Sequence, residues 1–292
     1  MKKQPIPVYT EQESFHKDFY KDFNISSYQD DPQEDLNRME PHRHTYYEII
    51  WVKEGYGSHL IDFQTFDFKG PCLFILNPGI VHKITKATPT QGYVVKFSRS
   101  FLLEEDLGGN ELLRYELFDN INARPIFHLN EKAVALLDDL MQKMLEEYNL
   151  HEELSRAILF SYLKVFLLQV FKLREEHTVK EPKNSYRYQL LLKFKKLVEQ
   201  HFKEEKKLNF YLTQLATSRR NLNDITNTYL GKSATDIIKE RVMLEAKRYL
   251  YAGELAIKEI SFTLGFDDPA YFTRFFTKNN GQSPTEFLKR KA

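Results

Sequence analysis

The sequence predicts a mixed α+β protein in which a β-rich domain is followed by helices and then by an all-α domain. Short segments rich in β-branched and aromatic residues, separated by glycine and proline, occupy residues 46–97. Two long stretches with apolar residues at helical spacing follow at 131–176. Beyond residue 187 the apolar residues also recur at helical spacing, with glycine and proline only at turns. Together these patterns indicate two domains joined through a helical segment.

Length and composition are those of a two-domain globular protein. The 292 residues suffice for two domains of ordinary size. Cys72 is the single cysteine, so no intrachain disulfide can form, which is typical of a reducing compartment. The amino terminus lacks the apolar stretch of a signal peptide, and residues 162–173, the most apolar run, are too few to span a bilayer. We therefore expect a cytoplasmic protein.

The near-neutral net charge hides a division between the two parts of the chain. Residues 183–292 contain 21 Lys and Arg against 12 Asp and Glu, whereas residues 1–182 contain 21 against 29. A basic carboxyl-terminal part is typical of a module that binds a polyanion such as DNA. The acidic remainder is expected to serve another purpose.

The β-rich domain is expected over residues 1–128. Its first 40 residues are polar with scattered aromatics, and we expect them to form an arm that packs over the domain. The expected strands are 46–53, 56–63, 66–68, 72–76, 81–84 and 92–97. Short strands at this spacing favour either an all-β barrel or a double sheet.

Two helices are expected to form a dimerisation segment over residues 129–177. Asn130 is a suitable N-cap for a helix over 131–148. The next helix, over 151–176, has two apolar rows, one of Leu154, Ile158, Tyr162 and Val165/Phe166 and the other of Leu159, Leu163, Leu167 and Val170/Phe171. Either the barrel and the preceding helix cover both rows, or one row is a dimer seam, which we favour. A polar linker with Pro182 follows at 178–186.

The carboxyl-terminal domain, residues 187–292, is expected to contain two helix-turn-helix units joined by a long helix. A first helix over 187–202 precedes a unit of 210–215 and 219–229. Ser233 caps a helix that runs to residue 251 without glycine or proline. The second unit has helices starting at Ile257 and Pro269, with Gly265 in the turn. An ordinary αα-hairpin has the same bare pattern, so the pattern alone leaves both possibilities open.

The second unit resembles that of the AraC-type transcription regulators. The matching segment reads Ile260…Leu264-Gly265-Phe266-Asp267-Asp268-Pro269-Ala270-Tyr271-Phe272-Thr273-Arg274-Phe275-Phe276, followed by Gly281-Gln282-Ser283-Pro284-Thr285-Glu286-Phe287. Arg241-x3-Glu245-Ala246-Lys247 resembles the connecting helix of the same family. The resemblance covers about residues 187–290 and implies a DNA-binding regulator.

The resemblance also implies which side chains contact DNA. Arg220 and Asn223 match positions that contact bases in the family, and both can make bidentate contacts to purine edges. Arg219 is expected to contact phosphate. The remaining candidates are Asn227 on the first recognition helix and Ala270, Thr273, Arg274 and Lys278 on the second, with Arg274 the foremost base contact. Each of these residues has the alternative of a solvated surface position. Thr226-Asn227 departs from the apolar-Lys pair more common in the family, which leaves open which helix dominates affinity.

Two motifs in the β-rich domain resemble the signatures of the cupin barrel. They are His42-x-His44-x3-Glu48-x6-Gly55 and Pro78-Gly79-x2-His82. In metal-binding cupins these histidines and the glutamate converge on one ion. AraC-type regulators keep a similar framework around an effector pocket. We therefore expect a cupin-like β-barrel with no bound metal, in which His42, His44, Glu48, Trp51 and His82 border a cavity for a small molecule.

The sequence thus predicts a sequence-specific transcription regulator, expected to be an activator, controlled by a small-molecule effector. Its expected partners are double-stranded promoter or operator DNA, a second copy of the chain in a homodimer, and RNA polymerase. Neither a catalytic residue nor a cofactor is expected. The alternative is a metal-dependent cupin enzyme fused to a DNA-binding domain, which metal analysis of the purified protein would distinguish.

Overall fold

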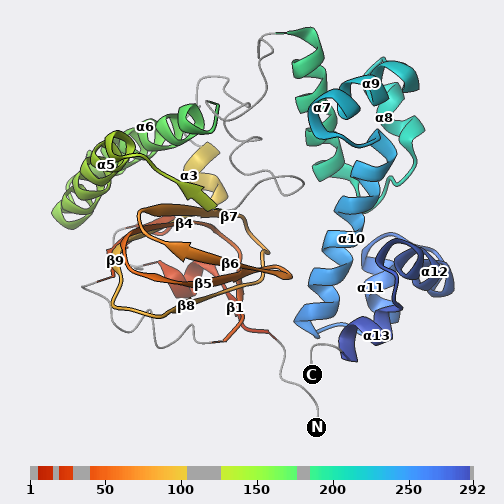
Figure 1. The fold of residues 1–292 in the computed structure, drawn as a ribbon, viewed down its shortest axis with the longest axis horizontal. Helices are drawn as coiled ribbons and strands as arrows, with labels where there is room; N and C mark the ends of the chain where they lie inside the picture. Colours follow the sequence, from red (N-terminus) through yellow and green to blue (C-terminus); the bar gives the residue numbers. More distant parts are fainter. Residues whose placement is uncertain (1–5, 16–19, 29–39, 104–125, 176–184, 290–292) are drawn as a thin grey trace. The chain divides into compact units, whose positions relative to one another are not determined.

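The computed structural model describes residues 6–15, 20–28, 40–103, 126–175 and 185–289 (Figure 1). It consists of two compact units, one of residues 7–119 and 123–178 and the other mainly of residues 179–292. The division at 178/179 falls at the start of the predicted linker 178–186. Residues 178–184 of that linker lie outside the described residues.

The first unit is built on two antiparallel sheets. A five-stranded sheet has the order β10-β7-β4-β9-β2, a three-stranded sheet has the order β6-β5-β8, and β1 and β3 form a short parallel pair. The strands are β1 (Val8–Tyr9), β2 (Phe23–Ser27), β3 (Arg43–His44), β4 (Tyr47–Glu54), β5 (Tyr56–Ile61), β6 (Gln64–Lys69), β7 (Cys72–Leu76), β8 (His82–Lys86), β9 (Gln91–Phe97) and β10 (Ile126–His128). The β-rich domain is confirmed as a double sheet, and the bounds of its six expected strands lie within two residues of those predicted.

Alternation along β4 divides the apolar side chains between two cores. Ile50 and Val52 point into the space between the two sheets, where Phe74 also packs. Ile49 and Trp51 point the other way, against two helices, α5 (Glu131–Leu150) and α6 (Ser155–Glu175). These helices lie side by side over the five-stranded sheet, so barrel and helices share one core (Figure 1).

The helix expected over 151–176 begins four residues later than predicted. Asn130 caps α5 as expected, because its Oδ1 accepts a hydrogen bond from the backbone of Ala133 at 2.9 Å. His151 ends α5 in the left-handed conformation, at φ 56°. The Ser155 hydroxyl then accepts a hydrogen bond from the backbone N–H of Glu152, which closes a turn before α6. Helical spacing continues through this turn, so the apolar pattern did not reveal it.

Part of the expected amino-terminal arm is a strand of the sheet. Phe23 to Ser27 pair antiparallel with Phe97 to Tyr93 of β9, and Phe23 and Ile25 are buried in the core. The strand has only these two apolar residues among its five, and a run this short is not enough for periodicity to identify a strand. Two short helices, α1 (Glu11–Ser14) and α3 (Arg99–Leu103), also belong to this unit. The rest of the arm, residues 1–5, 16–19 and 29–39, lies outside the described residues.

The carboxyl-terminal compact unit, mainly residues 179–292, is all-helical over its described residues. Its helices are α7 (Tyr186–His201), α8 (Leu208–Gln214), α9 (Arg219–Leu230), α10 (Ala234–Ala252), α11 (Ile257–Thr263), α12 (Pro269–Asn280) and α13 (Pro284–Lys289). The long helix α10 contributes to one continuous core with the helices on either side of it in sequence. Ser233 caps α10 as predicted, accepting a hydrogen bond from the backbone of Asp236. Buried Arg241 also ties α10 to α7 through Glu199 at 2.7 Å.

Among the described residues, no helix is both long enough and apolar enough to cross a membrane.

Candidate nucleic-acid interface and barrel site

The first helix-turn-helix consists of α8, a tight turn and α9. Ala216 adopts a positive φ of 47° in the turn, and the Ser218 hydroxyl caps α9 by accepting a hydrogen bond from Asn221 N–H. Leu222 and Ile225 are fully buried. The predicted DNA contacts Arg219, Arg220 and Asn227 are exposed on the remaining surface of α9. The unit therefore presents two guanidinium groups at the start of its second helix.

Asn223, which is predicted to contact bases, lies at the junction of α9 and α10. Its side chain is half-buried, and its Oδ1 accepts a hydrogen bond of 3.0 Å from the backbone N–H of Ala234, the first residue of α10. A bidentate contact to adenine needs both the amide oxygen and the amide nitrogen. In this structure the amide oxygen is held by α10, so Asn223 links α9 to the connecting helix.

The second helix-turn-helix consists of α11, a turn at Gly265 and α12. Gly265 has φ +68°, and a Cβ there would lie 2.1 Å from the backbone oxygen of Lys203, so only glycine fits. The Asp268 carboxylate caps α12 by accepting hydrogen bonds from the backbone of Ala270 at 2.8 Å and of Tyr271 at 3.1 Å. Pro269 occupies the first turn, as expected.

Helix α12 exposes three of its four predicted DNA contacts. Ala270, Arg274 and Lys278 are exposed, and 68% of the Arg274 side chain is accessible with its guanidinium 3.6 Å from Asp268. Thr273 lies next to Ala270 on the helix surface but is half-buried, and its hydroxyl donates to the Pro269 carbonyl.

Tyr271 also belongs to the exposed face of α12, although it is an aromatic residue. It is 54% exposed, whereas its neighbour Phe272 is fully buried. The guanidinium carbon of Arg274 lies 6.0 Å from the centre of the Tyr271 ring. The three-residue spacing from Tyr271 to Arg274 is the sequence feature that places both on one face.

In the barrel, four of the five residues predicted to border a cavity lie together. Nε2 of His44 is 3.7 Å from Glu48 Oε2, and Nε2 of His82 is 3.6 Å from the same oxygen. The ring of His42 lies 4.3 Å from that of His82, and the two residues exchange backbone hydrogen bonds. All four side chains belong to residues that are at most 2% exposed. We call these four residues the histidine cluster.

Outer hydrogen bonds orient the rings of the histidine cluster. The backbone carbonyl of Tyr46 accepts a hydrogen bond of 2.6 Å from Nδ1 of His44. Nδ1 of His82 lies 3.1 Å from Nε2 of His59, a residue that the sequence motifs did not include. Burial lowers the pKa of His59 to about 3, so this ring is neutral at physiological pH. His59 faces inward with Ile61 on β5, and strand alternation is the pattern that identifies it.

Trp51 does not join the histidine cluster. It lies three positions after Glu48 on β4, so the two side chains point to opposite faces of the sheet. Trp51 is buried in the core with α5, and its indole N–H donates to Asp138 at 3.4 Å. Its predicted place in the cavity is therefore corrected to the helix-covered face.

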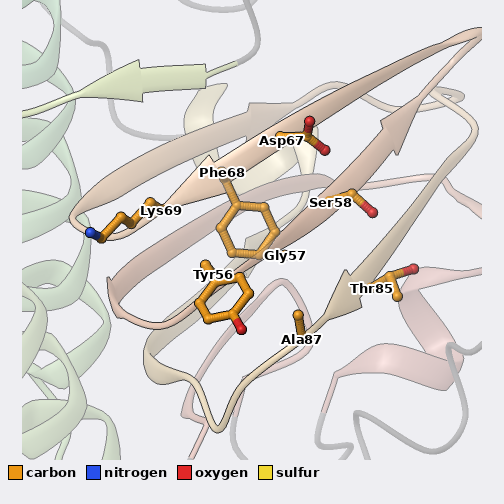
Figure 2. Close-up of a pocket in the computed structure, with 8 residues that line it drawn as sticks. All are labelled: Tyr56, Gly57, Ser58, Asp67, Phe68, Lys69, Thr85 and Ala87. Carbon is orange, nitrogen blue, oxygen red and sulfur yellow. The ribbon is translucent and has the colours of Figure 1, made fainter.

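An open groove of about 670 Å³ lies on the three-stranded sheet (Figure 2). It is lined by Tyr56, Gly57, Ser58, Asp67, Phe68, Lys69, Thr85 and Ala87. Aromatic side chains lead from the groove toward the histidine cluster. The Phe68 ring, which lines the groove, lies 5.6 Å from the Phe74 ring, and Phe74 lies 4.6 Å from the ring of His59, which contacts His82. The volume is within the range of small-molecule sites.

Comparison with known proteins yields two matching family models. A helix-turn-helix domain matches residues 211–290, and an AraC-like ligand binding domain matches residues 28–163. The HTH-type transcriptional regulator YfiF of Bacillus subtilis is 24% identical over 255 residues, covering 84% of this chain and 77% of YfiF. The HTH-type transcriptional activator RhaS of Klebsiella pneumoniae is 24% identical over 272 residues, covering 92% and 94%. Among solved structures, ToxT from Vibrio cholerae covers 92% of this chain and 98% of its own, with 16% identity and a TM-score of 0.44.

Proposed function

This chain belongs to the AraC-type transcription regulators, and we propose that a small molecule bound in its barrel domain controls how its two helix-turn-helix units engage DNA. AraC-type regulators are a non-enzymatic family, which argues against the alternative of a metal-dependent cupin enzyme fused to a DNA-binding domain. The observation that carries the proposal is the ligand-sized groove of about 670 Å³ in the same chain as two DNA-reading units.

The connecting helix α10 supports binding to two consecutive turns of DNA. Its 19 residues give a length of about 28 Å at 1.5 Å per residue. Major-groove faces recur about every 34 Å along one side of B-DNA. In our proposal Arg220 and Arg274 contact bases, while Arg219 and Lys278 contact phosphates. Asn227, Ala270 and Thr273 add further contacts along the two helices.

We place the effector in the groove because it is open to solvent, whereas the histidine cluster is closed. Lys69 and Asp67 offer charges of both signs at its rim, and Phe68 forms an apolar floor. A few polar groups around an apolar surface are typical of small-molecule sites. The effector would be a small polar compound with an apolar side, and its binding would change the affinity for DNA by a coupling free energy between the two sites.

Filling the groove is expected to abolish the effector response. Operator DNA is first selected from a random pool, and candidate metabolites are identified by the rise in melting temperature that a ligand of the folded state must cause. Such a compound should change the Kd for the operator in the wild-type chain. In Ser58→Trp, whose indole would occupy the groove, the compound should change neither the melting temperature nor the Kd, while the basal Kd is retained.

The matched control is Thr65→Trp, an exposed residue on the adjacent strand β6 that does not line the groove. It should respond as the wild type does. An unchanged response in Ser58→Trp would contradict the groove as the effector site. The absence of any compound that both stabilises the chain and alters the operator Kd would contradict effector control itself.

We also propose that the chain forms a homodimer through α6. Leu154, Ile158 and Val165 of the first apolar row are 69%, 36% and 42% exposed, whereas the second row is buried against the sheet and α5. Large apolar side chains in one row mark an interaction surface. Ile158→Glu would place a carboxylate in this interface and should raise the dimer dissociation constant roughly 10- to 100-fold. Sedimentation equilibrium measures this, with Gln142→Glu on the exposed surface of α5 as a control that should dimerise normally.

The relative RhaS bears the name of a transcriptional activator, and we propose the same role for this chain. Activation in the cytoplasm would require contact with RNA polymerase at the promoter. Transcription in vitro from the selected operator should therefore rise when the chain is added, and a fall would identify a repressor.

A further inference from the structure

We propose that Lys206 is a positioning residue that fixes the two recognition helices, α9 and α12, relative to each other and so sets the spacing of the two half-sites in an operator. The inference rests on the proposed binding of both helix-turn-helix units to consecutive turns of DNA. Lys206 is a half-buried residue of the loop 202–207, which joins α7 to α8. We call this segment the α7–α8 loop.

The ammonium of Lys206 bridges two backbone segments that are far apart in the sequence. Its Nζ donates hydrogen bonds to the carbonyl of Lys203 at 2.6 Å and to the carbonyl of Gly265 at 2.9 Å. Both carbonyls lie just beyond the carboxyl ends of helices, α7 and α11, where the helix dipole favours a positive charge. Two of the three N–H donors of the ammonium are therefore used inside the protein, in hydrogen bonds that its charge strengthens.

Through these contacts Lys206 acts on the turn that precedes α12. The backbones of Lys203 and Gly265 touch, since a Cβ added to Gly265 would lie 2.1 Å from the Lys203 oxygen. The ammonium also lies 4.6 Å from the centre of the Phe266 ring, which attracts a cation. Phe266 is buried and packs on Phe272 of α12, with ring centres 5.3 Å apart. The position of α12 is thus tied to the α7–α8 loop.

The same loop is fastened to the first helix-turn-helix. The hydroxyl of Tyr211, a fully buried residue of α8, donates to the backbone carbonyl of Glu205 at 2.7 Å. Nζ of Lys203 donates to the hydroxyl of Tyr249 on α10 at 3.1 Å. The adjacent residues Glu205 and Lys206 are therefore each hydrogen-bonded to a different helix-turn-helix unit. The loop is a second link between the two units, in addition to the connecting helix α10.

A second link matters because the register of two half-sites on DNA is strict. A turn of about 10–10.5 base pairs spans about 34–36 Å, so one extra base pair moves a half-site by about 3.4 Å along the axis and about 35° around it. Two recognition helices held rigidly lose little conformational entropy when they bind the spacing that fits them. Without the Lys206 contacts we expect the chain to accept a wider range of spacings and to bind the best one more weakly.

Spacing-variant operators test this in the full-length chain. Lys206→Met keeps the length of the side chain and removes its ammonium. The half-sites are first assigned as the positions where single-base changes lose their effect in Arg220→Ala and in Arg274→Ala. Fluorescence anisotropy then gives the Kd for the selected operator, for operators with one base pair more or fewer between the half-sites, and for DNA that keeps one half-site. The Kd at a changed spacing divided by the Kd for the selected operator is the spacing ratio.

We expect a spacing ratio of roughly 10 or more in the wild-type chain, because a wrong spacing removes base contacts that are each worth about 1–3 kcal/mol. In Lys206→Met the ratio should fall roughly threefold or more, and the Kd for the selected operator should rise. Loss of stability alone cannot produce this result. A partly unfolded variant binds every DNA more weakly by the same factor, which leaves the ratio unchanged.

Lys207→Met is the matched control, since Lys207 is an exposed lysine next to Lys206 in the same loop. It removes the same charge, so any general attraction to DNA falls equally in the two variants. Its spacing ratio should equal that of the wild type. A reduced ratio in Lys207→Met would overturn the assignment to the Lys206 hydrogen bonds.

A wild-type spacing ratio in Lys206→Met would overturn this inference alone and leave two-turn binding intact. Equal binding of the wild-type chain at all spacings, or to DNA with one half-site, would overturn the inference together with two-turn binding. Cooperative thermal unfolding verifies that each variant folds. If Lys206→Met does not fold, Lys206→Gln gives the same decision, since its shorter side chain also lacks the ammonium.

Discussion

Phe272→Ala is expected to lower the free energy of unfolding of the DNA-binding unit by about 3–5 kcal/mol. Phe272 is fully buried on α12 and packs against Phe266 and Phe276 with ring centres 5.3 and 6.0 Å apart. Removing the ring leaves a cavity in the only core that the second helix-turn-helix shares with α10 over the described residues. A domain stable by about 5–15 kcal/mol would lose a large fraction of its stability. Urea unfolding followed by far-UV circular dichroism measures the change. Tryptophan fluorescence would not report on it, because the single tryptophan, Trp51, lies in the other unit.

The neighbouring residue offers a matched control. Tyr271→Ala also removes an aromatic ring from α12, but this ring is 54% exposed. Exposed substitutions usually change stability by no more than about 0.5 kcal/mol. Equal destabilisation by the two variants would show that the packing of α12 differs from the one described.

Arg274→Ala is expected to weaken binding to the selected operator by about 1–3 kcal/mol, or roughly 5- to 150-fold in Kd. The exposed guanidinium of Arg274 can make two hydrogen bonds to a guanine edge in the major groove. Losing them should also relax the preference for one base at one operator position. Fluorescence anisotropy against the operator and its single-base variants gives both quantities.

Lys278→Ala is the matched control for charge, since it removes one positive charge from the same helix. It should weaken binding about equally on all sequences and reduce the dependence of log K on log salt by about one. If Arg274→Ala produced this same uniform loss, Arg274 would be a phosphate contact, and Arg220 would become the foremost base contact.

The strands and helices were predictable where local pattern and packing agree. The barrel strands are punctuated by Gly70-Pro71 and Pro78-Gly79, and their bounds followed from that punctuation. Ser233 caps α10 through a contact within three residues of sequence, so cap chemistry predicted that helix start. The two cupin-like motifs also predicted that His44, Glu48 and His82 would lie together.

Tertiary contacts explain what the sequence did not reveal. Asn223 is held by Ala234, eleven residues away across a turn, and no helical pattern encodes such a bond. The left-handed residue His151 interrupts an apolar repeat that continues in phase beyond it. The position of Trp51, by contrast, could have been predicted from the sequence. Trp51 is three positions after Glu48 on one strand, and strand alternation places the two side chains on opposite faces.

The pairing of β2 with β9 has a consequence for synthesis of the chain. Partners in this pair are separated by 66 to 74 positions, from Ser27 with Tyr93 to Phe23 with Phe97. At about 5–20 residues per second, Phe23 and Ile25 are synthesised on the order of ten seconds before their partners on β9. The apolar side chains of β2 must therefore wait for β9, the last of the long strands in the described part of the barrel. This interval is where a nascent chain of this protein would most need a chaperone.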